Sequence, residues 1–210
     1  MRLCLRVWAV IALWVVMLPT AAAHADVPRT ADGNGVLVGS GDAQKQLEIF
    51  CDPQCPDCAA FVSTSGDRIA GDLASGRLAV TYRWLTFLDR KHHNDVSARV
   101  TNALFLAADP STSPSAYQAF VQDLYRHQSK DGPNNNDIAA MARESGIADE
   151  VAARIAAGDH VVDTAAVNDA NRTRLEQVNP ENPGTPTVYD LKANRVVDIQ
   201  DPGWLDALSS

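Results

Sequence analysis

The chain has 210 residues, with 18 Lys and Arg against 26 Asp and Glu, so its formal net charge is −8. An acidic chain lacks the clustered cations that attract phosphate, and this excludes nucleic acid as an expected partner. With 46% hydrophobic and 21% charged residues the chain can form a hydrophobic core, and its four cysteines are too few for a fold held together mainly by disulfides.

Residues 1–25 are predicted to form a secretory signal peptide. Two arginines precede the uncharged apolar run Val7–Leu18, and Ala23-His24-Ala25 fits the small-x-small pattern of a cleavage site. The run is shorter than the roughly 20 residues that a membrane-spanning helix needs. We therefore expect an exported protein of the periplasm, the cell envelope or the exterior. An uncleaved segment would instead tether it to the membrane.

The first part of the mature chain predicts a strand–helix–strand unit. Strands are expected at 36–38, 47–51 and 78–87, where β-branched and aromatic residues gather. The helix between the last two is expected to begin at Pro56, which suits a first helical turn, and to end at Ser75-Gly76.

The middle of the chain has apolar residues at helical spacing. Helices are expected at 95–109, 114–127, 137–144, 149–157 and 160–177. Strand signals return only at 185–189 and 196–199, joined by a turn, and Asp201-Pro202 is expected to open a short terminal helix. Because strands from both ends can complete one sheet, the helical block is interpreted as an insertion.

The motif Cys55-Pro56-Asp57-Cys58 lies at the turn from a strand to a helix. The first cysteine is then placed at the helix N-terminus, where unpaired N–H groups and the helix dipole favour a thiolate. The second cysteine lies one turn further, within reach of a disulfide formed by the first. This arrangement is typical of reversible dithiol chemistry.

Three segments carry a family resemblance: LEIFCDPQCPDCAAF at 47–61, YRWLTFLD at 82–89, and Gly184-Thr185-Pro186-Thr187. Together they resemble the DsbA-like branch of the thioredoxin superfamily. The resemblance implies an α/β thioredoxin fold with an inserted helical domain. The expected parts are an N-terminal segment with the first strand at 26–45, a thioredoxin-like core at 46–90 and 175–210, and a helical insertion at 91–174.

The resemblance also implies roles for the residues of the motif. Cys55 would be the nucleophile and the exposed sulfur, and Cys58 the buried resolving cysteine of a redox-active disulfide. Pro186 would be a cis-proline facing that disulfide, with the backbone of Thr185 pairing with substrate. Pro56 and Asp57, between the cysteines, would tune the reaction. No cofactor is implied.

The implied activity is dithiol/disulfide exchange on cysteines of exported proteins, by a monomer that exchanges electrons with a membrane or envelope redox partner. Oxidation is favoured over reduction by the resemblance, and an isomerase is disfavoured because 26–45 is too short for a separate dimerisation domain. Two alternatives stay open. One is a redox-inactive module that binds peptides beside Pro186. The other is a structural zinc site formed by the cysteines with His92 or His93.

Two further residues depart from the simplest pattern. Many superfamily members have a buried acid six residues before the nucleophile, as a proton shuttle for the resolving thiol. Here that position is Ile49, and the acid is one residue earlier, at Glu48. Glu48 is the candidate for the shuttle and would then tune the reaction, although the alternation of a strand could turn it to the other face. Cys51 is an odd thiol, expected to be free and partly buried, with a regulatory pairing to Cys55 as the alternative.

Asp57, with Asp52 close in sequence, is expected to disfavour the Cys55 thiolate and so to make the disulfide a weaker oxidant. In Asp57→His the pKa of Cys55 should fall and the redox equilibrium with glutathione should shift toward a stronger oxidant. Thiolate absorbance during a pH titration would measure the pKa. An unchanged or higher pKa in the variant would contradict the hypothesis.

Overall fold

The computed structural model describes residues 27–208, so the predicted signal peptide lies outside the described residues. The strands are β1 (Val36–Val38), β2 (Lys45–Cys51), β3 (Leu78–Trp84), β4 (Thr187–Asp190) and β5 (Arg195–Val196). The helices are α1 (Pro56–Ala74), α2 (Phe87–His92), α3 (Val96–Leu106), α4 (Pro114–Arg126), α5 (Asn135–Glu144), α6 (Asp149–Ala157) and α7 (Thr164–Val178). Within this range no helix combines the length and apolar character needed to cross a membrane.

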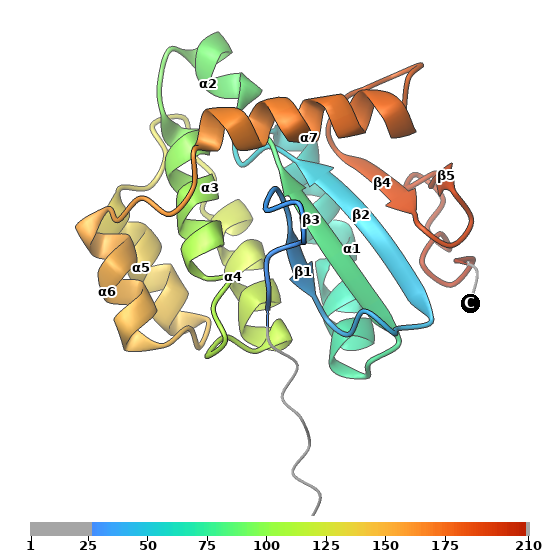
Figure 1. Ribbon diagram of the computed structural model, residues 1–210, viewed down its shortest axis with the longest axis horizontal. Coiled ribbons are helices and arrows are strands. Elements are labelled where there is room, and N and C mark those ends of the chain that lie inside the picture. Colours follow the sequence, from blue (N-terminus) through green and yellow to red (C-terminus); the bar gives the residue numbers. More distant parts are fainter. Residues whose placement is uncertain (1–26, 209–210) are drawn as a thin grey trace, which may run out of the picture.

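The strands form one five-stranded sheet in the order β1-β3-β2-β4-β5. β2 and β3 are parallel and are joined through α1, whereas the other neighbours are antiparallel. α1 lies behind the sheet and α7 crosses in front of it, while α3–α6 stand to one side (Figure 1). The expected α/β fold, with strands from both ends of the chain completing one sheet around a helical insertion, is confirmed.

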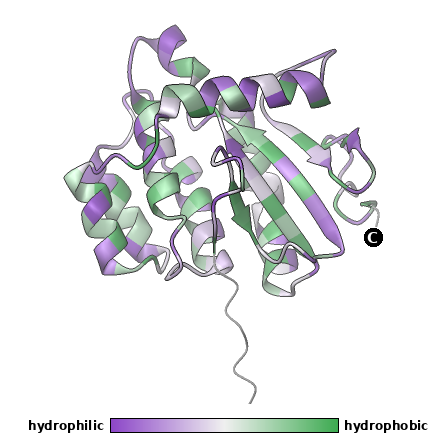
Figure 2. Ribbon diagram, in the orientation of Figure 1, coloured by the Kyte–Doolittle hydropathy of each residue, from purple (hydrophilic) through white to green (hydrophobic). Residues whose placement is uncertain are grey.

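Alternation along β2 directs its side chains to two separate cores. Leu47, Ile49 and Cys51 belong to the main core, whereas Phe50 packs in a smaller cluster with Leu175 of α7. Hydrophobic residues are concentrated in the central strands, while α7 carries many hydrophilic residues (Figure 2). The sheet is therefore covered on both faces, which is usual for parallel strands.

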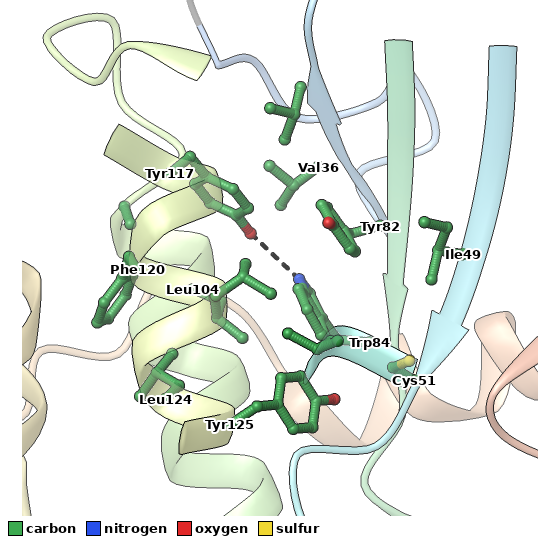
Figure 3. Packing of buried hydrophobic residues seen from close by; sticks show 14 of the residues in the cluster. Val36, Ile49, Cys51, Tyr82, Trp84, Leu104, Tyr117, Phe120, Leu124 and Tyr125 are labelled. Atoms are coloured by element: carbon green, nitrogen blue, oxygen red, sulfur yellow. Dashed lines mark hydrogen bonds between the residues drawn. The ribbon is translucent and has the colours of Figure 1, made fainter. Parts of the chain in front are cut away.

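Aromatic side chains join the sheet to α4 in the main core (Figure 3). The Trp84 indole is stacked on Tyr82 with ring centroids 4.9 Å apart, and its Nε1 donates to the Tyr117 hydroxyl at 3.2 Å. The Tyr82 hydroxyl bonds Gln118 at 2.6 Å. The polar atoms of these buried aromatics therefore have partners, as burial requires.

The prediction of a strand over 78–87 is wrong at its end. β3 ends at Trp84, and the short helix α2 begins at Phe87. The Trp84 carbonyl accepts from Asn171 Nδ2 at 2.9 Å, and the Thr86 N–H donates to Asn168 Oδ1 at 2.9 Å. Both asparagines belong to α7. Hydrogen bonds to α7 therefore satisfy the backbone groups that a longer strand would have paired within the sheet.

Three smaller expectations also differ from the structure. The last long helix begins at Thr164 rather than at 160, because the Asp163 carboxylate caps it by accepting from two backbone N–H groups. β5 covers only Arg195–Val196. Residues after Asp201 form successive turns instead of a helix, since so short a segment gains little from helical hydrogen bonds of its own.

Glu48 lies on the α7 side of the sheet, in a buried ionic network. Its Oε1 accepts from Arg83 Nε at 2.9 Å, and its Oε2 accepts from Arg174 Nη2 at 2.8 Å. Arg83 also pairs with Asp32 at 2.7 Å. The predicted shuttle role of Glu48 is therefore not supported, because both oxygens are bonded to arginines on the face opposite α1, which carries Cys58.

Removing the charge of Glu48 should destabilise the fold. In Glu48→Gln the two arginines lose their shared carboxylate, and we expect a loss of about 3 kcal/mol in the free energy of unfolding, at the low end for a broken buried pair because Arg174 is partly exposed. Urea denaturation of the reduced proteins would measure it. Glu176→Gln, which removes the exposed partner of Arg172, is the control and should change stability by less than about 1 kcal/mol. Equal effects of the two variants would contradict the prediction.

Candidate active site

The turn between β2 and α1 places Cys55 at the helix start. The Cys55 N–H donates to the Asp52 carbonyl at 2.9 Å, and Cys55 then occupies the N-cap of α1 with Pro56 in the first turn. No side chain caps this helix. The first turn therefore leaves unpaired N–H groups near the Cys55 sulfur, as the motif predicts.

Cys55, Cys58 and Cys51 are all free thiols here. Cys58 is 0% exposed and Cys55 is 6% exposed. Cys55 is thus the more accessible of the pair, but the expectation of an exposed sulfur is wrong. The reason is that a second segment of the chain covers it.

The covering segment is the loop that contains Pro186. The Thr185–Pro186 peptide bond is cis, and the Cys55 thiol donates to the Thr185 carbonyl at 3.3 Å. Antiparallel pairing of β2 with β4 sets Thr187 beside Phe50 and so brings this loop to the end of β2. The sheet register therefore joins two segments that are 130 residues apart in sequence.

A groove of about 710 Å³ runs past this loop along α1. Its walls include Asp57 and Phe61 of α1, Pro186 of the loop, and Trp204. The rings of Phe61 and Trp204 are 6.0 Å apart. Trp204 reaches this wall because the last turns of the chain fold back over α1.

Asp52 has a role that sequence reasoning missed. Its carboxylate is 0% exposed and accepts three hydrogen bonds: from the Gln54 N–H at 2.9 Å, from Ser97 Oγ at 2.5 Å and from the Leu88 N–H at 3.0 Å. These donors come from the active-site turn, from α3 and from α2. Asp52 thus ties the turn before Cys55 to the helical insertion.

Burial governs much of the acid–base behaviour of the site. It raises the pKa of the Cys58 thiol well above its ordinary value. The pKa of Cys55 is raised too, by the neighbouring Cys58 thiol and then by burial. The sequence also predicts a raised pKa for Cys55, but it attributes the rise to Asp52 and Asp57, which are not the main causes here. Asp57 is exposed, where solvent screens its charge, and its effect on Cys55 stays a prediction.

The histidines do not assemble a metal site with the cysteines. His92 Nδ1 is 3.1 Å from Gln54 Oε1, and His93 ends α2 in a left-handed conformation. Among residues 27–208, no group of three or more His, Cys, Asp or Glu side chains could hold a metal ion.

A sequence model of the thioredoxin family matches residues 31–195, most of the chain. The chain belongs to the thioredoxin family. It is 33% identical over 183 residues to the serine/threonine-protein kinase PknE of Mycobacterium tuberculosis, a match that covers 83% of this chain but only 31% of the kinase. The chain thus spans about a third of that curated relative.

Two solved structures are similar to this thioredoxin-family chain. One is MdbA, a thiol-disulfide oxidoreductase from Corynebacterium diphtheriae, with a TM-score of 0.71 and 23% identity, covering 87% of this chain and 93% of MdbA. The other is reduced DsbA from Mycobacterium tuberculosis, with a TM-score of 0.64 and 22% identity, covering 83% of this chain and 90% of DsbA. The predicted DsbA-like thioredoxin fold is confirmed.

The buried Asp52 carboxyl predicts a pH effect on stability. Burial raises its pKa above the ordinary 3.8, so its contribution to the free energy of unfolding is full below that value and is lost as the pH rises through the folded-state pKa. Asp52→Asn lacks this titration. The stability of wild type relative to the variant should therefore fall as the pH rises above 3.8.

Urea denaturation of both proteins across this pH range would measure the difference. Asp42→Asn, which removes an exposed carboxylate, is the control for the Asp-to-Asn change itself. If the stability of wild type relative to Asp52→Asn instead rises with pH, the prediction is contradicted.

Proposed function

We propose that this thioredoxin-family protein is a thiol-disulfide oxidoreductase that exchanges disulfides with cysteine-containing exported proteins. The observation that carries the proposal is the position of the Cys55 sulfur, at the N-terminus of α1 and 3.3 Å from the Thr185 carbonyl. Cys58 lies directly behind it in the core. The similarity to MdbA, a thiol-disulfide oxidoreductase, supports the same chemistry.

In the oxidising direction, a substrate thiolate attacks Cys55 of the Cys55–Cys58 disulfide, and Cys58 leaves as a thiolate that takes up a proton. A second substrate thiolate then attacks the mixed disulfide at the substrate sulfur. The substrate leaves with a disulfide, and the enzyme leaves as the dithiol seen here. In the reducing direction, Cys55 attacks a substrate disulfide and Cys58 resolves the mixed disulfide.

Burial gives the two thiols different tasks. Cys58, with no exposed surface, meets only Cys55 and its core neighbours, so an external disulfide has to react at Cys55. The Thr185 carbonyl and the groove past Pro186 offer an extended peptide a backbone acceptor and walls of mixed apolar and polar side chains. We therefore assign substrate binding to Thr185 and Pro186.

We further propose that the protein acts after export, as a monomer, and mainly as an oxidase that a membrane or envelope partner reoxidises. An oxidising compartment supports stable disulfides in its substrates. The charge of Asp57 acts against a strongly oxidising potential, and the redox equilibrium of Cys55–Cys58 with glutathione measures that balance.

Variants of the two cysteines test the proposed activity. Wild type should accelerate the reduction of insulin and the reoxidation of a reduced, scrambled substrate. Cys55→Ser should lower both rates to the uncatalysed background, because it removes the thiol at which an external disulfide has to react. Cys58→Ser should accumulate mixed disulfides, visible by non-reducing electrophoresis, because nothing resolves them.

Ser63→Ala, an exposed change on α1, is the control and should keep wild-type rates. Full turnover by Cys55→Ser would overturn the assigned role. Peptide binding by wild type without any exchange would instead identify a redox-inactive binding module.

A further inference from the structure

The site contains three buried thiols, and the proposed exchange uses only two of them. Cys51 is the last residue of β2 and is 1% exposed, so the expectation of a partly buried thiol is wrong. Its side chain lies in the main core near Trp84 (Figure 3). α1 covers this face of the sheet and brings Cys58 into the same core.

All three thiols lie in the main core, where Cys51 ends β2 and Cys58 lies in the first turn of α1. The Cys51 and Cys55 thiols both act on the pKa of Cys58, whereas Cys51 is not among the main groups that act on Cys55. The arrangement points to Cys58 as the sulfur that both of the others can reach. This arrangement matters because thiol–disulfide exchange proceeds by attack of one sulfur on the central sulfur, with the third sulfur as leaving group.

A polar group from α4 lies close to the end of β2. The Tyr125 hydroxyl donates to the Asp52 carbonyl at 3.1 Å, at the residue that follows Cys51. This bond anchors the backbone beside Cys51, whose side chain lies in the same core as Cys58. A thiol held in place close to another is favoured to react with it.

We propose that Cys51 is a third redox-active cysteine, and that Cys58 forms a disulfide with either Cys55 or Cys51. This inference rests on the proposed redox role of the Cys55–Cys58 pair. The Cys51 thiolate attacks Sγ of Cys58, so the Cys51–Cys58 bond forms and the Cys55–Cys58 bond breaks. Cys55 receives the electron pair and takes up a proton, which replaces the one that Cys51 releases. The number of disulfides is unchanged, so no further oxidant is needed.

The rearranged form has a different reactivity. Cys55 is then a single thiol beside Thr185, and it can attack a substrate disulfide. Cys58 cannot resolve the resulting mixed disulfide while it is bonded to Cys51. The Cys51–Cys58 bond is also buried, which shields it from external thiols. Pairing with Cys51 would therefore regulate whether the enzyme completes its exchange.

The variant Cys55→Ser tests this pairing directly, because it keeps Cys51 and Cys58. The full chain would be oxidised with diamide, denatured, alkylated and digested with trypsin. Mass spectrometry would then measure the mass of peptide 46–68, which contains both cysteines. We expect this peptide to lose two hydrogens and to take up no alkylating agent. The matched variant Cys58→Ser keeps Cys51 and Cys55 and should be alkylated at both. An alkylated pair in Cys55→Ser, or a disulfide only in Cys58→Ser, would overturn the proposal.

Wild type gives a second measurement that does not depend on the folding of a variant. In the oxidised protein, alkylation of Cys55 reports the Cys51–Cys58 form, and alkylation of Cys51 reports the Cys55–Cys58 form. We expect labelling of both residues, and loss of the Cys55 label in Cys51→Ala. Labelling of Cys51 alone would overturn the pairing even if insulin is reduced. A Cys51–Cys58 disulfide in a chain without exchange activity would contradict the proposed function instead.

Discussion

The buried carboxylate of Asp52 is the constraint on which the candidate site depends. Its three donors are neutral groups from the active-site turn, α2 and α3. A buried carboxylate needs such bonds, because unpaired burial of a charge is very costly. The turn that places Cys55 at the start of α1 is thereby fixed against the helical insertion. The insertion thus supports the active-site turn as well as covering one side of the sheet.

The residues on the two faces of β2 have different roles. Glu48 faces α7 and joins Arg83 and Arg174 in a buried ionic network. Cys51 faces the core under α1, next to Cys58. Successive side chains of a strand point to opposite faces. Because the acid stands at position 48 and not at position 49, the carboxylate lies on the α7 face and the apolar Ile49 lies in the core under α1. For this reason the acid at 48 stabilises the packing of α7 and does not serve the buried thiol.

The site also depends on pairing between distant strands. Cys55 comes from the turn after β2, whereas Thr185 and Pro186 precede β4. The register that sets Phe50 opposite Thr187 brings the two segments into contact. The last turns then add Trp204 to the groove wall by packing against Phe61. Each contact joins residues more than 100 positions apart, as with Cys55 and Thr185, which are separated by 130.

The α/β class, most helices, the helix start at Cys55-Pro56 and the family resemblance are all predictable from the amino-acid sequence, because they depend on local periodicity, on capping and on short motifs. Three other features follow from tertiary contacts: β3 stops at Trp84, Glu48 faces α7, and Asp52 is buried among neutral donors. The fold also buries the third thiol, Cys51, in the same core as Cys58. Burial and long-range hydrogen bonding depend on contacts between segments that are distant in sequence, and local sequence patterns do not specify these contacts.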